Sequence, residues 1–269
     1  MALRIQNNIE ALGAHRSLQE TNTHLTKSMS RLSSGFRINS GADDAAGLAI
    51  SERMRGQVRG VSQAMRNAQD GISMVQTTEG AMSEVHSMLQ RVRELAVQYK
   101  NGSLSANDRT AIQSEVNQLA SEIERIGNQT NFNGVCLLNQ ATSVTFQVGA
   151  NDGESISVPT ISLTGSLGTS WFSLTAAGAN DISEIDAAIN VLSSQRATFG
   201  SVQNRFEHLL NSLGAYHENL VSAESRIRDL DMAEGMVDMT RYQVLQQAGT
   251  AMLAQANQSN QGVLSLLQG

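Results

Sequence analysis

Heptad spacing of apolar residues is the feature that most limits the folds open to this chain. Between residues 58 and 99, apolar side chains recur in steps of three and four, with one phase slip near Thr78 and Glu79. This spacing predicts a long helix with a stutter, beginning near Asp44 and ending before the Asn101-Gly102 breaker. At 1.5 Å per residue such a helix is about 85 Å long, well beyond the ~30 Å of a small domain.

Two more helices follow the same pattern. Ser105 and Asp108 form an acidic variant of the capping box at the start of the second helix, whose apolar stripe stops at Gly127. Residues 182–230 carry the most regular stripe and predict a third long helix, able to run antiparallel to the first. Pro159 is the only proline, so no proline interrupts the helices on either side of it.

Residues 142–180 differ in character, because Ser, Thr and Gly replace the heptads there. Val144, Phe146 and Val148 alternate with polar residues, and Asn151-Asp152-Gly153 supplies a turn. This segment predicts a β-hairpin and a short cap. It is too short for an independent domain.

The two ends of the chain, residues 1–40 and 236–267, are amphipathic and rich in Asn, Gln and Ser. Their apolar stripes are thin, so each end needs a partner helix or a neighbouring subunit for stability. We expect assembly and chaperone contacts along these stripes. The residues concerned are Ile5, Ile9, Leu12, Leu25, Leu32, Val244, Leu253, Val263, Leu264, Leu266 and Leu267.

Together these patterns predict a mainly α fold: a long antiparallel helical rod or coiled-coil bundle with a small β-hairpin region, and terminal helices that pair as an inner coiled coil. The expected domains are residues 1–43 together with 231–269, and residues 44–230 including the hairpin region. Gly35, Gly41 and Gly47 bracket a polar connection between the terminal helix and the rod. Asp43 and Asp44 are predicted to be the cap and first-turn acids of the long helix.

Composition excludes several classes of function. The formal net charge of −6 leaves no general basic footprint for nucleic acid. No window reaches the roughly 18 apolar residues of a membrane span, so neither nucleic acid nor a membrane is an expected partner. Aromatic residues make up 4% of the chain, which argues against a large pocket of the kind enzymes use.

Cys136 is the sole cysteine, so an intramolecular disulfide and a multi-cysteine metal cluster are both excluded. Free cysteines are usually small buried apolar residues, and we expect the same of Cys136. The first residues are amphipathic and lack the apolar core of a secretory signal. No cofactor and no metal are expected.

Seven segments closely resemble bacterial flagellin, the subunit of the flagellar filament. They occur in the family's order, which makes the resemblance specific, and the match covers roughly residues 1–138 and 190–269. The segments are RLSSGFRINS (31–40), GADDAAGLAIS (41–51), QDGISMVQTTEGAM (69–82), QRVRELAVQ (90–98), NFNGV (131–135), QNRFEHLLNSL (203–213) and VLQQAGTAMLAQANQ (244–258).

The resemblance implies a subunit that polymerises helically into the filament for motility, with its terminal helices in an inner tube and the rod in an outer tube. It also implies unfolded export through the flagellar type III system, and hence a secreted, extracellular protein. Expected partners are further copies of the chain, an export chaperone, and the filament cap and hook-junction proteins. Large variable outer domains are nearly absent, so the chain resembles a short form of the family.

A host receptor, Toll-like receptor 5, is a further partner that the resemblance implies. The family's recognition surface corresponds to Arg91, Leu95 and Glu115, with Gln90 and Glu94 beside them. The alternative is that Arg91 and Glu94, spaced i and i+3, only stabilise a helix face. Both can hold, since the same face would also contact neighbouring subunits.

Two other functions fit parts of the pattern. Some flagellins carry a metalloprotease, but His217-Glu218 is followed by Asn219, Leu220 and Val221, so the zinc motif H-E-x-x-H is absent and no enzyme is expected. A hook–filament junction protein shares helical ends of this type and remains the closer alternative. The rod motifs and the VLSLL tail favour flagellin.

Overall fold

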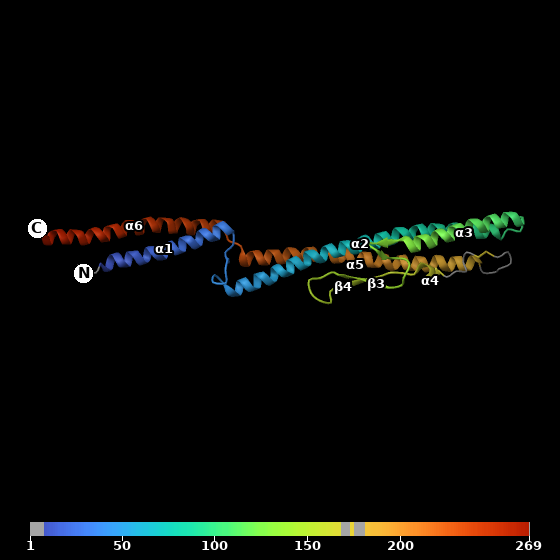
Figure 1. Cartoon of the computed structure of the whole chain (residues 1–269), viewed down its shortest axis with the longest axis horizontal. Helices are drawn as coiled ribbons and strands as arrows, with labels where there is room; N and C mark the ends of the chain where they lie inside the picture. The colour runs from blue at the N-terminus through green and yellow to red at the C-terminus, as the bar shows by residue number, and fades with distance from the viewer. Residues whose placement is uncertain (1–7, 168–172, 175–180, 269) are drawn as a thin grey trace. The chain divides into compact units, whose positions relative to one another are not determined.

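The computed structural model describes residues 8–167, 173–174 and 181–268, with side chains up to residue 258 (Figure 1). The chain is mainly helical, as predicted. Its elements are α1 (Ile9–Ser34), α2 (Ala45–Tyr99), α3 (Ala106–Gln129), β1 (Asn131–Phe132), β2 (Val135–Cys136), β3 (Ser143–Gln147), β4 (Ser155–Pro159), α4 (Leu163–Leu167), α5 (Asp181–Arg228) and α6 (Met232–Gln268).

The chain divides into two compact units. Unit 1 consists of residues 1–56 and 219–269, and unit 2 of residues 57–218. Helices α2 and α5 each contribute residues to both units.

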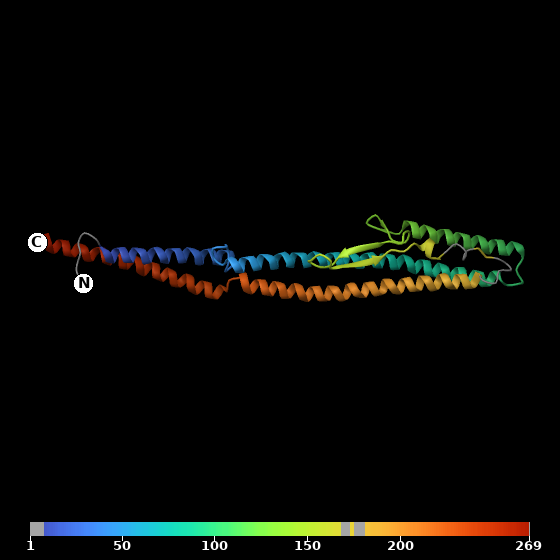
Figure 2. The same ribbon diagram turned by 90° about the horizontal axis from the view of Figure 1, so that it is seen from below.

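In unit 2, α2 and α5 run antiparallel, as the heptads predicted (Figure 2). Two ion pairs link the helices in opposite chain order: Arg196 Nη2 lies 2.6 Å from Glu79 Oε1, and Arg93 Nε lies 2.6 Å from Asp186 Oδ1. The antiparallel rod is therefore confirmed.

The core of unit 2 lies where α2, α3, α5 and the β3–β4 hairpin meet. Phe206 on α5 is fully buried, and its ring meets the ring of Phe146 on β3 edge to face at 5.9 Å. A Cβ added at Gly71 on α2 would lie 2.7 Å from the Phe206 ring. The absence of a side chain at residue 71 therefore makes room for a large aromatic one.

The phase slip in the heptads does not interrupt α2. Thr78 points into the core and is buried, yet its hydroxyl donates a hydrogen bond of 2.8 Å to the carbonyl of Met74 one turn earlier. Because this polar group is satisfied inside its own helix, the helix passes the slip without a break.

Helix α3 begins as predicted but ends later. Ser105 is its N-cap, and the reciprocal bonds of a capping box with Asp108 are both present. The predicted stop at Gly127 is wrong, since α3 continues to Gln129. Gly127 is instead buried, with Leu163 of α4 packed against it, so this glycine serves close packing and does not end the helix.

The predicted hairpin is confirmed as β3 and β4, which pair antiparallel with Phe146 opposite Ile156. Gly153 in its turn has a φ of 86°, a conformation that favours glycine. The hairpin is held to α2 by Asn67, whose side-chain amide donates to the Gln147 carbonyl at 2.8 Å.

A second, smaller hairpin was not predicted. Strands β1 and β2 pair around Asn133 and Gly134, whose φ values of 49° and 81° are both left-handed. The Asn-Gly dipeptide between short strands was the available signal. Cys136 lies on β2 and is exposed, so the expectation that it is buried is wrong: only two residues form this strand, and both face solvent.

Candidate assembly surface and charged patch

The terminal helices α1 and α6 lie side by side in unit 1 (Figure 1). Asn8 caps α1 by accepting a hydrogen bond from the Ala11 amide at 3.0 Å, and Gly35 ends it in the left-handed conformation with φ 75°. Asp231 caps α6 by accepting from the Ala233 amide at 2.8 Å. A short polar side chain therefore caps the first turn of each helix.

The two helices pair antiparallel. The Asn8 side chain donates to the Ala256 carbonyl at 3.0 Å, and Gln246 donates to Asn22 Oδ1 at 2.7 Å. The rings of His24 on α1 and Tyr242 on α6 also stack across the helix pair, with their centroids 5.2 Å apart. The pairing of the terminal helices is therefore present within a single chain.

Two glycines of α6 permit this close approach. A Cβ added at Gly249 would lie 3.1 Å from Leu18 Cδ1, and one added at Gly235 would lie 3.0 Å from Leu32 Cδ2. Sequence reasoning missed both positions. A glycine inside an otherwise helical pattern was the signal that could have revealed them.

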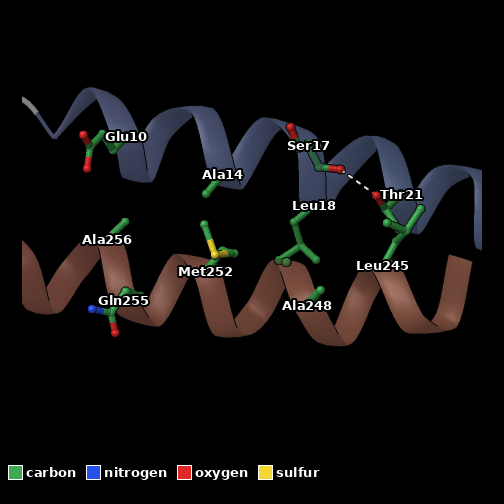
Figure 3. Close-up of a pocket in the computed structure, with 11 residues that line it drawn as sticks. Glu10, Ala14, Ser17, Leu18, Thr21, Leu245, Ala248, Met252, Gln255 and Ala256 are labelled. Carbon is green, nitrogen blue, oxygen red and sulfur yellow. Dashed lines mark hydrogen bonds between the residues drawn. The ribbon is translucent and has the colours of Figure 1, made fainter.

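A groove runs between α1 and α6 (Figure 3), and most of its walls are apolar. Leu18 of α1 and Met252 of α6 point into it from opposite sides, with Leu245 and Ala248 beside them. Ser17 and Thr21 on its rim form a hydrogen bond along α1, from the Thr21 hydroxyl to the Ser17 carbonyl. The groove is open along its length and presents no convergent set of catalytic groups.

Pairing leaves much of the apolar surface of both helices in contact with solvent. No described residue of α1 is buried. Large exposed apolar surfaces often mark interaction sites. The exposed members of this apolar surface are Ile9, Leu12, Met29, Met232, Met236, Val237, Val244, Leu245 and Met252.

The predicted assembly residues fall into three groups. Ile9, Leu12 and Val244 are exposed, whereas Leu25, Leu32 and Leu253 are half-buried in the helix pair. The remaining ones lie outside the described side chains: Ile5, Val263, Leu264, Leu266 and Leu267.

Asp43 organises the connection between α1 and α2. Its carboxylate lies 2.6 Å from Lys27 Nζ and 3.5 Å from Arg31 Nη2, and it accepts hydrogen bonds from the amides of Asn39 and Ser40. Lys27, and to a lesser degree the bonds from Ser40 and Asn39, hold the pKa of Asp43 well below its ordinary value. The prediction of Asp43 as the cap of α2 is wrong, because Asp43 lies in the turn before the helix and its carboxylate bonds to Lys27, Asn39 and Ser40 instead.

Asp44, predicted as a first-turn acid, is instead the cap of α2, since it precedes Ala45 and its Oδ1 accepts from the Gly47 amide at 2.9 Å. The other end of the connection is held by α5. The Arg37 amide donates to the Arg228 carbonyl at 2.7 Å, and the Arg228 guanidinium lies 4.7 Å from the centre of the Phe36 ring. Arg228 also pairs with Glu52 at 2.6 Å, which lowers the pKa of Glu52.

We expect Asp43→Asn to lower the free energy of unfolding at pH 7 by about 1–2 kcal/mol, because it removes the charge-assisted bonds of a carboxylate whose side chain is only 11% exposed. A carboxylate whose folded pKa is lowered contributes its stability above the unfolded pKa, near 4, and loses it as pH falls towards the folded pKa. The difference between the parent and the variant should therefore shrink below about pH 4.

Urea unfolding of the monomer at pH 7 and pH 3 measures this difference. Asp152→Asn, in the exposed β3–β4 turn, is the control and should stay within about 0.5 kcal/mol of the parent at pH 7. An equal deficit for Asp43→Asn at both pH values would contradict the ion-pair account.

A second candidate surface lies in unit 2, where α2 and α3 meet. Arg91 donates from Nε and Nη2 to Glu115 at 3.0 and 2.9 Å and from Nη1 to Glu94 at 3.1 Å. These carboxylates raise the pKa of Arg91, with Glu115 contributing most. Gln90 is also exposed, so four of the five predicted receptor residues form one surface patch.

Leu95 differs from the other four. It is 2% exposed and belongs to the core of unit 2, so it lies beneath the patch in the isolated chain. Both α3 and α5 pack against α2, so more of the α2 surface is buried than contact with a single helix would bury.

Within the described parts of the chain, no three His, Cys, Asp or Glu side chains gather closely enough to hold a metal ion. The helices described there also lack a segment both long and apolar enough to cross a membrane.

Comparisons with known proteins agree with this architecture. The model of the bacterial flagellin N-terminal helical region matches residues 5–143, and that of the C-terminal helical region matches residues 182–267. The chain is 48% identical over 272 residues to a flagellin of Halalkalibacterium halodurans (98% of this chain, 99% of that protein). It is 45% identical over 304 residues to a flagellin of Bacillus subtilis (99% and 100%).

Among solved structures, the crystal structure of Bacillus cereus flagellin is similar, with a TM-score of 0.51 and 33% sequence identity. The match covers 55% of this chain and 88% of that one.

Proposed function

The chain belongs to the bacterial flagellin family, whose members are structural subunits of the extracellular flagellar filament, and we propose that its terminal helix pair is the surface through which subunits assemble. The family is one of structural proteins that polymerise with copies of themselves, and not one of enzymes. The expectation of a flagellin with little variable domain is confirmed, because the matched N-terminal region (5–143) and C-terminal region (182–267) leave only a short segment between them.

The observation that carries the proposal is the exposed apolar surface of α1 and α6. Val237 and Val244 on α6, and Ile9 and Leu12 on α1, are exposed in the single chain. Burial of such side chains contributes roughly 25 cal/mol per Å². Contacts with neighbouring copies would supply that burial, and because such contacts run head to tail, the assembly stays open.

Seeded elongation tests the proposal. Purified monomer added to filament fragments should grow fibres many times longer than the seeds, as seen by electron microscopy. Growth limited to a short collar would support the hook–filament junction alternative, and no growth at all would contradict assembly through these helices.

We propose different positions in the filament for the two expected domains. Residues 1–43 with 231–269 form an inner tube, and residues 44–230 an outer tube around it. The exposed apolar residues of α1 and α6 support the inner position, since an inner wall is covered by neighbours on several sides. Amide hydrogen exchange in α1 and α6 should therefore slow on polymerisation.

Before assembly, the same apolar surface would promote aggregation. We propose that an export chaperone covers roughly residues 236–267 in the cell, and that the chain leaves unfolded through the flagellar type III system. A single cysteine and a single proline suit this route, because neither disulfides nor several slow prolyl isomerisations must be resolved after export. At the filament ends, the cap and hook-junction proteins would contact the same helices.

We further propose that the patch around Arg91 is read by Toll-like receptor 5. Glu115 and Glu94 hold the Arg91 guanidinium in place, so a receptor would meet a preorganised charged group, and arginines of this kind are frequent hot spots. Gln90 lies beside it on the same surface. Leu95 would act from below by supporting α2.

Arg91→Ala should reduce receptor signalling by about tenfold or more, the effect of losing one hot-spot side chain. Signalling by monomer in receptor-expressing reporter cells is the measurement. Arg125→Ala on α3 is the matched control, since it removes an equally exposed arginine that pairs with Glu122. Equal activity of the Arg91→Ala variant and the parent would exclude this site. Leu95→Ala is a poor test, because it would open a cavity in the core.

A further inference from the structure

The exposed methionines of the described chain are confined to the terminal helix pair. Met29 on α1 is 53% exposed, and Met232, Met236 and Met252 on α6 are 51%, 48% and 64% exposed. In unit 2, by contrast, Met74 and Met82 are fully buried, and Met65 and Met88 are half-buried. Accessible thioethers therefore coincide with the proposed assembly surface.

Two of these side chains lie among apolar neighbours. Met252 points into the groove between α1 and α6, towards α1 and near Ala14 (Figure 3). Met236 lies beside Val237 and Val244 on an open apolar face of α6. In both places an exposed methionine side chain lies among apolar groups.

We propose that Met29, Met232, Met236 and Met252 are reversible oxidation sites whose sulfoxides block addition of the subunit to a filament. The oxidant is a peroxide. The thioether sulfur attacks one peroxide oxygen, the O–O bond breaks, an S–O bond forms, and water leaves when hydrogen peroxide is the oxidant. The sulfur is oxidised by two electrons and the peroxide oxygen is reduced.

The inference rests on the proposed assembly through α1 and α6. In the free subunit, a sulfoxide at these exposed positions stays hydrated, so the helix pair tolerates it. In the assembled contact, the S–O group would lose its water without a matched donor, and burying an unsatisfied polar group is unfavourable. Oxidation thus acts on assembly far more than on the fold of the monomer.

The order of oxidation tests the sites without any assembly step. Because Cys136 is exposed and would also react, the experiments use the full chain with Cys136→Ser. Monomer is treated with hydrogen peroxide and its methionine-containing peptides are followed by mass spectrometry. The four exposed methionines should oxidise about tenfold or more faster than Met74 and Met82. Equal rates at all six positions would overturn the assignment.

Seeded elongation with untreated seeds then tests the consequence. Peroxide-treated monomer should elongate about tenfold or more slowly than untreated monomer. Both methionine sulfoxide reductases, one for each sulfoxide epimer, should restore the rate when supplied with a dithiol, which is oxidised to a disulfide as the sulfoxide oxygen leaves as water. A variant with all four methionines changed to leucine, a volume-conserving change, should elongate equally well with and without peroxide.

Loss of elongation by the treated leucine variant would place the damage elsewhere and overturn the proposal. Normal elongation by the oxidised parent would overturn it as well. Failure of untreated parent to elongate would instead contradict the proposed function itself, so the two failures are distinguishable.

Discussion

Replacing Val244 with aspartate should abolish seeded elongation while leaving the free subunit folded. Val244 lies on α6, is 59% exposed, and is one of the residues predicted for assembly from the sequence stripe. Valine and aspartate have similar helix propensities, and the position faces solvent in the single chain. The monomer therefore has little to lose from the substitution.

The assembled state responds differently. A carboxylate placed in an apolar contact must lose its hydration without a paired cation, which costs several kcal/mol per subunit. In a polymer every added subunit bears the same cost, so the effect repeats along the fibre. We expect the critical concentration for growth to rise by at least about a hundredfold, the equivalent of roughly 2.7 kcal/mol.

Sedimentation of polymer at a series of monomer concentrations gives the critical concentration, and circular dichroism reports the helix content of the monomer. Val244→Ile is the matched control, because it keeps the apolar character and adds one methylene group; it should elongate like the parent. Normal growth of the Val244→Asp variant would show that this face of α6 stays exposed in the filament.

The sequence alone was sufficient for the helices and the main hairpin. Heptad spacing predicted α2 and α5 to within a few residues because a long apolar stripe can be buried only along another helix. The Ser105–Asp108 capping box and the Asn151-Asp152-Gly153 turn are local signals, and the structure confirms both. These features depend on residues close to one another in the sequence, so they can be predicted from it.

The features that were missed depend on distant residues. Asp43 leaves the helix start because Lys27 and Arg31, on a different helix, hold its carboxylate. Leu95 is buried because both α3 and α5 pack against α2. A heptad stripe predicts contact with one partner helix and does not reveal a second one. Gln90, Arg91, Glu94 and Glu115 were grouped by the resemblance to flagellin alone, because the heptads say nothing of polar residues; in the structure Arg91 bonds to both Glu94 and Glu115.

Phe206→Ala and Gly71→Ala should each destabilise unit 2, and their effects should not add. Phe206 is fully buried, so its loss should cost about 3–5 kcal/mol through lost burial and an unfilled cavity. Gly71→Ala should cost about 1–3 kcal/mol, because the new methyl group would lie 2.7 Å from the Phe206 ring. In an unobstructed helix the same change would stabilise by roughly 1 kcal/mol.

In the double variant, the methyl group at residue 71 enters space that the ring has left. Gly71→Ala should then be neutral or stabilising in the Phe206→Ala background, with a coupling free energy of at least about 1 kcal/mol. Amide hydrogen exchange in α2 and α5 around residues 71 and 206 measures the stability of unit 2. Gly80→Ala is the control on the same helix: a Cβ there meets nothing within 4 Å, so it should stabilise both backgrounds equally. Additive effects at residues 71 and 206 would mean that the helices move apart to accept the methyl group, which would contradict a tightly packed core at this crossing.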